Sequence, residues 1–118
     1  MPGEIRVFAY GTLRDPNLLA VVLGHLFLGV RRPAVLHGFR RKKVPGYDFP
    51  VIIPHEGGRI DGVLLEGLST EDLANLDNYE DVSAGLYERA EGEVTIDDEP
   101  EPNPRLRAFV YVAGRLLK

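Results

Sequence analysis

The feature that most restricts the fold is the short spacing between the segments that have strand character. Six segments are rich in β-branched and aromatic residues, namely 5–10, 34–39, 51–53, 59–65, 86–96 and 106–112. Most connections between them are shorter than the dozen or so residues that a parallel crossover needs. We therefore expect an α+β fold whose sheet is mixed, mostly antiparallel and curled into a small β-barrel.

Two segments have helix signals, and they supply the only connections long enough for crossovers. Asp15 followed by Pro16 is typical of a helix start, and Gly24 suits the end of that helix. A second helix is expected from Ser69, because residues 69–72 resemble a capping box with Asp in place of Glu or Gln. Both helices should flank the barrel. Between two of the strand segments, residues 56–58 (Glu-Gly-Gly) predict a hairpin turn.

Composition limits the size and the class of the protein. A chain of 118 residues, 44% apolar and 27% charged, is expected to form one domain over residues 1–118. The chain has no cysteine, which excludes disulfides, thiolate zinc sites and a cysteine nucleophile. The longest apolar run, residues 19–28, is too short to span a membrane. Since the N-terminus has no signal-peptide pattern, we expect a cytoplasmic protein with no membrane partner.

Charge argues against a nucleic-acid partner, because the net charge is −4. One basic run, residues 40–43 (Arg-Arg-Lys-Lys), continues the second strand segment. It is consistent with an anionic ligand or with a solvated edge strand, on which charge discourages aggregation. No aromatic stacking platform adjoins it, so the edge strand is the preferred interpretation. Residues 97–105, with three prolines and four acids, predict an exposed loop.

Glu80 is the strongest candidate for an acid or base. If the second helix continues to its end, a rotation of about 100° per residue places Glu80 close to Leu73 and Leu76 on the apolar face. A carboxylate buried there without a cationic partner has a raised pKa, as a general acid or base requires. Two alternatives remain open: the helix frays and Glu80 is solvated, or an arginine pairs with it.

Further candidates surround the first strand. Residues 10–13 (Tyr-Gly-Thr-Leu) join a strand to a helix, where Gly11 allows close approach and exposed N–H groups can bind a carboxylate. Tyr87 could hydrogen-bond the acid or a ligand, although such a tyrosine, like Tyr111, is more often part of a core. The three histidines have no metal-ligand spacing.

These segments together resemble the γ-glutamylcyclotransferase-like family, and most closely its AIG2-like and γ-glutamylamine cyclotransferase branches. Residues 7–13 are similar to the opening strand and Tyr-Gly-Ser/Thr-Leu motif of that family. The similarity continues through its Tyr/Phe-Pro segment, its Leu-Asp-x-Phe/Tyr-Glu motif, its Tyr-x-Arg and its last strand, at residues 47–51, 76–80, 87–89 and 108–112. The pattern departs from the family at Asp81, where many members have glycine.

The resemblance implies a fold, an activity and a site. It implies a small barrel with flanking helices, which cyclises a γ-glutamyl amine, amino acid or peptide to 5-oxoproline and a free amine without metal or organic cofactor. Glu80 would be the catalytic residue, Tyr10, Gly11, Thr12 and Leu13 the loop that holds the glutamyl group, and Tyr87 a pocket tyrosine. A small-molecule-binding protein without turnover, with Glu80 neutralised by Arg40 or Arg89, is the alternative. A third reading is another ligase or lyase that uses the same pocket.

Overall fold

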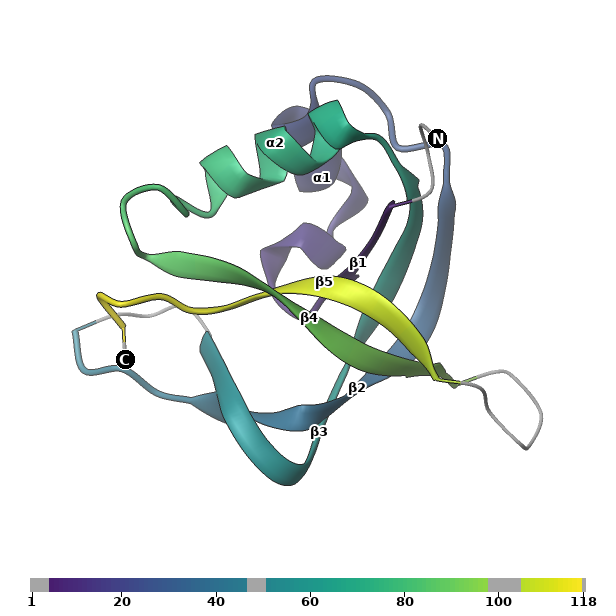
Figure 1. Ribbon diagram of the computed structural model, residues 1–118. Coiled ribbons are helices and arrows are strands. Elements are labelled where there is room, and N and C mark those ends of the chain that lie inside the picture. Colours follow the sequence, from purple (N-terminus) through teal and green to yellow (C-terminus); the bar gives the residue numbers. More distant parts are fainter. Residues whose placement is uncertain (1–4, 47–50, 98–104, 118) are drawn as a thin grey trace.

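The computed structural model describes residues 5–46, 51–97 and 105–117 (Figure 1). Residues 47–50 of the family's middle segment and most of the acid-rich loop, residues 98–104, therefore lie outside the described part of the chain. The elements are β1 (Ile5–Ala9), the 3₁₀ turn η1 (Thr12–Arg14), α1 (Pro16–Leu23), β2 (Val30–Lys42), β3 (Val51–Leu68), α2 (Thr70–Tyr79), β4 (Tyr87–Ile96) and β5 (Leu106–Ala113).

The strands form a closed barrel in the order β1-β3-β2-β4-β5. Four of the five contacts between neighbours are antiparallel. The barrel closes where β1 meets β5 in parallel, through the single pair Val7 and Phe109. Both helices lie at one side of this barrel (Figure 1). The expected mixed, mostly antiparallel barrel with two short flanking helices is thus confirmed.

The predicted hairpin turn at residues 56–58 is wrong, and so is the count of six strands. The two segments on either side of it form one long strand, β3, and both pair with β2. Residues 55–58 of β3 lie opposite Gly38 of β2, between the pairs His37–Arg59 and Phe39–Pro54. These residues form an irregular bulge that requires glycine at two positions. Gly38 has a left-handed φ of +87°, and a Cβ on Gly58 would lie only 2.2 Å from the carbonyl oxygen of Phe39.

The helix ends follow the predicted signals. Asp15 caps α1, with its carboxylate accepting a hydrogen bond from the N–H of Asn17 at 2.9 Å, and Gly24 ends the helix with a φ of +82°. Ser69 and Asp72 form the capping box of α2, in which each side chain accepts from the other residue's N–H at 3.0 Å. These local hydrogen bonds determine where each helix begins.

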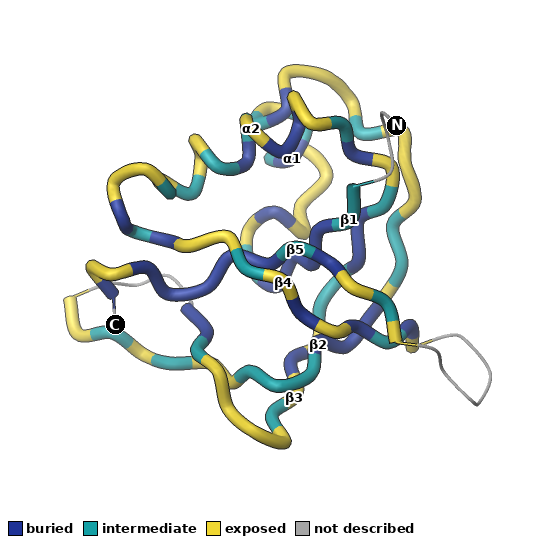
Figure 2. Tube along the Cα trace, in the orientation of Figure 1, coloured by how far each residue is buried: buried dark blue, intermediate teal, exposed yellow. Residues whose placement is uncertain are grey.

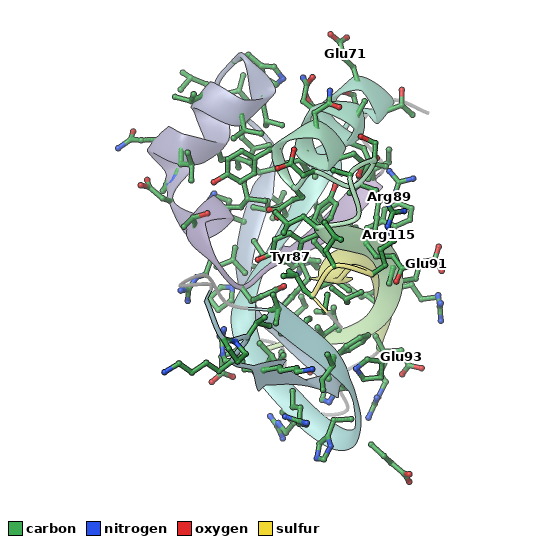
Figure 3. All side chains as sticks on the ribbon, turned by 90° about the vertical axis from the view of Figure 1, so that its left-hand side faces the viewer. Glu71, Tyr87, Arg89, Glu91, Glu93 and Arg115 are labelled. Atoms are coloured by element: carbon green, nitrogen blue, oxygen red, sulfur yellow. The ribbon has the colours of Figure 1, made fainter. Side chains whose placement is uncertain are left out.

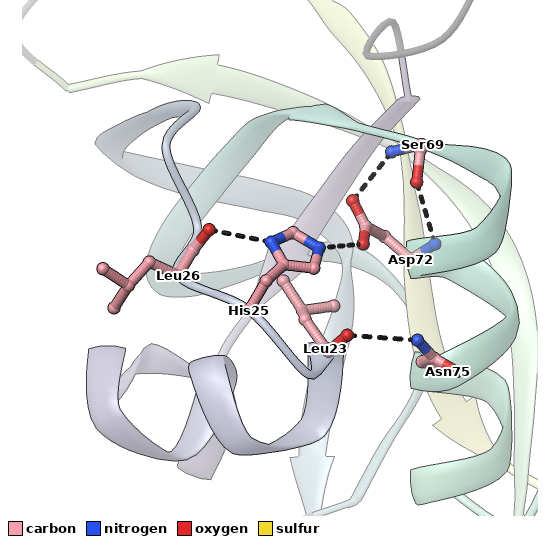
Figure 4. A network of polar contacts seen from close by, with 6 residues as sticks. All are labelled: Leu23, His25, Leu26, Ser69, Asp72 and Asn75. Carbon is pink, nitrogen blue, oxygen red and sulfur yellow. Dashed lines mark hydrogen bonds and ion pairs between the residues drawn. The ribbon is translucent and has the colours of Figure 1, made fainter.

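A histidine joins the end of α1 to the start of α2 (Figure 4). The Nε2 of His25 lies 2.7 Å from Asp72 Oδ1, and its Nδ1 lies 2.8 Å from the carbonyl oxygen of Leu26. Both ring nitrogens face acceptors, an arrangement that suits the doubly protonated ring. The hydrogen bonds to Asp72 and Leu26 accordingly raise the pKa of His25. The amide of Asn75 adds a bond to the carbonyl of Leu23 at 3.3 Å.

The buried side chains form two clusters, because both faces of the sheet are covered. One fills the barrel and includes Phe8, Tyr10, Leu36, Ile52, Leu64 and Val110. The other lies between the outer face of the sheet and the helices and includes Val7, Leu19, Leu65, Leu76, Tyr87 and Tyr111. Figure 2 shows the resulting dark blue along β1 and most of β5, and yellow on the outward side of α2. Both clusters reach the C-terminal end of β1.

Candidate active site

The six residues predicted for the site line a single cavity of about 310 Å³. They come from the loop after β1, the end of α2 and the start of β4, and they are Tyr10, Gly11, Thr12, Leu13, Glu80 and Tyr87. Five further lining residues were not assigned to the site from sequence, namely Phe8, Ala9, Tyr79, Leu86 and Tyr111. Among these, Tyr79 had a visible signal, since it directly precedes Glu80. The volume is in the range of small-molecule sites.

Glu80 keeps its helical position although α2 formally ends one residue before it. Its N–H bonds to the carbonyl of Leu76 at 3.0 Å, so the last turn includes it. Leu76 and Leu73, on the same face, pack into the cluster between sheet and helices. The expected rotation is confirmed: Glu80 is half-buried and lines the cavity.

The chain leaves α2 through a Schellman motif centred on Asp81. The N–H of Asp81 bonds to the carbonyl of Asn78 at 3.2 Å, and the N–H of Val82 bonds to that of Asp77 at 3.1 Å. The motif requires a left-handed residue, and Asp81 has a φ of +53°. This geometry explains why glycine suits this position, and it places a second carboxylate beside Glu80.

The electrostatic surroundings favour a protonated Glu80. Burial, and to a smaller extent the negative charge of Asp81, raises the pKa of Glu80 to about 7. Within residues 5–46, 51–97 and 105–117, no arginine or lysine forms an ion pair with its carboxylate. Arg89 pairs with Asp77 at 2.7 Å, and Arg40 donates to the carbonyl of Arg41 at 3.4 Å. Neither arginine named in the alternative therefore neutralises Glu80 in this structure.

The loop after β1 is held at several points. The hydroxyl of Tyr10 donates to the carbonyl of Tyr111 at 2.5 Å, which ties the start of the loop to β5. Gly11 begins the η1 turn, and its carbonyl accepts from the N–H of Arg14 at 3.1 Å. Thr12 Oγ1 lies 3.2 Å from the hydroxyl of Tyr79, so the loop also contacts the end of α2.

Tyrosines form much of the cavity wall. The hydroxyl of Tyr111 donates to Asp77 Oδ1 at 2.6 Å, and Arg89 binds the other oxygen of that carboxylate. Burial raises the pKa of Tyr87, as does the charge of Glu80, so this phenol stays protonated and able to donate. Figure 3 shows Tyr87 near the middle of the molecule, with Arg89 further from the middle.

The described residues offer neither a metal cluster nor a membrane-spanning helix. They contain no group of three or more His, Asp or Glu side chains arranged to hold a metal ion. Among these same residues, no helix has both the length and the apolar character needed to cross a membrane.

Comparison with known proteins agrees with the family resemblance of the sequence. The sequence profile of the family described as gamma-glutamyl cyclotransferase, AIG2-like, matches residues 7–117. Protein AIG2 C of Arabidopsis thaliana is 33% identical over 111 residues, which are 94% of this chain and 64% of the relative. The chain spans less than two thirds of the length of the curated relatives that it matches.

Solved structures show the same fold. A solution structure of an Arabidopsis thaliana protein superposes with a TM-score of 0.77 and 31% identity, covering 96% of this chain and 64% of that one. A structure titled "Gamma-glutamyl cyclotransferase" superposes with a TM-score of 0.71 at 17% identity, covering 92% of this chain and 66% of that one. At that identity the second match speaks for the fold alone.

Proposed function

The chain belongs to the AIG2-like gamma-glutamyl cyclotransferase family, and we propose that it cyclises a γ-glutamyl amine, amino acid or peptide to 5-oxoproline and a free amine. The observation that carries the proposal is Glu80, a half-buried carboxyl with a pKa of about 7 in the wall of a small-molecule-sized cavity. At neutral pH such a group is present in both protonation states. One side chain can therefore act first as base and then as acid.

The reaction is an intramolecular acyl transfer. The α-amine of the substrate attacks the γ-carbonyl carbon, and a new C–N bond closes the five-membered ring. Glu80 takes a proton from that amine as it attacks. The bond to the original amine then breaks, and Glu80 returns the proton to the departing nitrogen. Because both reacting groups belong to one molecule, the cavity contributes by holding the ring-closing conformer.

The loop of residues 10–13 is proposed to hold the glutamyl group. The first amides of a helical turn have no acceptor within the turn, which makes those of Thr12 and Leu13 suitable donors for the substrate's α-carboxylate. The bond between Tyr10 and the Tyr111 carbonyl keeps the loop in position across the end of the barrel. Tyr87, a protonated phenol in the same wall, is a candidate donor to the oxygen of the reacting carbonyl.

The test is release of 5-oxoproline from a panel of γ-glutamyl amino acids, γ-glutamyl-ε-lysine, simple γ-glutamyl amines and glutathione. Wild type and Glu80→Gln run side by side, with Glu71→Gln as the matched control. Glu71 is an exposed residue in the first turn of the same helix and does not line the cavity. We expect release by wild type and Glu71→Gln, and a loss of about a hundredfold or more in Glu80→Gln. Binding of these compounds without any release would instead support a non-catalytic binding protein.

A further inference from the structure

In the basic run at the end of β2, Arg41 contacts a residue that lines the candidate active site. On β2 the side chains of Ala34 and Leu36 point into the barrel, where they belong to its buried cluster. The bulge at Gly38 adds one residue to the alternation, so that Phe39 packs against the same cluster. Arg41, two residues further, has the orientation of Phe39 and pairs with the fully buried Ile52. Bulges re-aim side chains in this way beside functional sites.

Arg41 contacts Tyr10, which forms part of the cavity wall. The guanidinium carbon of Arg41 lies 5.8 Å from the centre of the Tyr10 ring, within range of a cation–π contact. Tyr10 itself lines the cavity together with Glu80. Burial raises the pKa of this tyrosine, and the nearby Glu80 adds to the effect whereas Arg41 opposes it. Arg41 and Glu80 thus have opposite effects on the pKa of the same phenol.

Arg41 is exposed and forms no ion pair with a carboxylate in the described part of the chain. Arg6, Arg32, Arg89, Arg105 and Arg107 all form ion pairs there. The edge-strand interpretation explains why the run is charged, because among the described residues β2 beyond His37 pairs only with β3. It does not explain why one of the four cations is turned inward over a cavity-lining ring.

We propose that Arg41 binds a carboxylate on the leaving amine and thereby selects γ-glutamyl amino acids and peptides over γ-glutamyl amines that lack this carboxylate. The inference rests on the proposed function. In the proposed function the glutamyl α-carboxylate is bound by the amides of Thr12 and Leu13. Arg41 is exposed and does not itself line the cavity, so this cation is available to a part of the substrate that extends out of the cavity beyond the glutamyl group. Guanidinium groups bind carboxylates through paired, charge-assisted hydrogen bonds.

A matched pair of substrates isolates the carboxylate. γ-Glutamyl-alanine and γ-glutamyl-ethylamine differ only in the carboxylate of the leaving amine, so their kcat/KM ratio measures its recognition. We expect wild type to prefer γ-glutamyl-alanine and Arg41→Gln to lose about tenfold of that ratio, with kcat/KM for γ-glutamyl-ethylamine unchanged. Arg40→Gln is the control, because Arg40 precedes Arg41 on the strand and faces the other way. Arg41→Lys should keep part of the preference, and added salt should weaken it.

The outcomes separate this inference from the proposed function. An unchanged ratio in Arg41→Gln, or an equal loss with both substrates, would overturn the role of Arg41 while leaving the cyclisation in place. If wild type releases no 5-oxoproline, the proposed reaction fails. The same pair of compounds is then compared by calorimetric binding to wild type and to Arg41→Gln. A preference for γ-glutamyl-alanine that Arg41→Gln removes supports the carboxylate site, and equal affinities refute it.

Discussion

Replacing Glu80 by glutamine should stabilise the protein at neutral pH, and the gain should disappear in acid. The folded protein raises the pKa of this carboxyl from 4.5 to about 7, first through burial and then through Asp81. Between these two values the folded chain holds a proton that the unfolded chain has released. The free energy of unfolding therefore falls as the pH rises through this window and stays low above it. Glutamine has no such proton.

The size of the effect follows from the two pKa values. Their difference is about 2.5, and each tenfold change in an equilibrium is worth about 1.36 kcal/mol, which gives an upper limit of about 3.4 kcal/mol. Glu80 is only half-buried, so screening by solvent reduces this figure. We expect the free energy of unfolding of Glu80→Gln to be about 1 to 3 kcal/mol higher than that of wild type at a pH of about 8. At a pH of about 4.5 the two values should be equal.

Urea unfolding of both proteins at a series of pH values measures this difference directly. Other titrating groups are common to the two chains and cancel when one curve is subtracted from the other. Glu71→Gln makes the same chemical change at an exposed position on α2 and serves as the control. A difference between Glu80→Gln and wild type that stays constant from about pH 4.5 to about pH 8 would refute the burial argument, whether or not the protein is an enzyme.

Two other substitutions test the charge of Asp81 beside Glu80 and the charge of His25 beside Asp72. Asp81→Asn keeps a residue that tolerates the left-handed conformation, and it removes the negative charge that is the second cause of the raised Glu80 pKa. The acid limb of the pH–rate profile should therefore move to lower pH. An unmoved limb would show that Asp81 does not contribute to the raised pKa. His25→Gln should remove a stabilisation that is present below the ordinary histidine pKa of 6.5 and lost as the pH rises through the raised folded pKa. The loss of stability in His25→Gln, measured by thermal unfolding, should thus be largest in mild acid and should shrink at alkaline pH.

The helix ends and the position of Glu80 were predictable because their causes are local. The cap of α1 depends on Asp15 and Pro16, and the capping box of α2 depends on two residues three apart. Glu80 required one further assumption, that α2 stays helical for its last turn. The bond from its N–H to the carbonyl of Leu76 meets that assumption.

The course of β3 was not predictable from its own residues. The Glu-Gly-Gly segment has the composition of a hairpin turn, and nothing within it distinguishes a turn from a bulge. The deciding partner is Gly38, which lies on β2 and has a left-handed backbone. The same bulge turns Arg41 inward, so the basic run could not be assigned a face from a simple alternation.

The polar contacts of the site depend on the closed barrel. Tyr111 and Asp77 are 34 residues apart, and Tyr10 and Tyr111 are 101 residues apart. Motifs near residues 10, 80 and 87 could be listed separately from the sequence. That they surround one cavity follows from the pairing of β1 with β5, for which the sequence contains no short-range signal.

Because of that pairing, the cavity lies where the first and last strands of the barrel, β1 and β5, meet. β1 and β5 share a single bridge, between Val7 and Phe109, whereas each of the other neighbouring strands pairs over several residues. The cavity wall includes residues 10–13, which follow β1, and Tyr111, which lies on β5. A molecule that contacts both strands would stabilise the barrel at the strand pair with the fewest backbone hydrogen bonds. Occupancy of the cavity should therefore slow amide exchange most along β1 and β5, far beyond the residues that the molecule itself contacts.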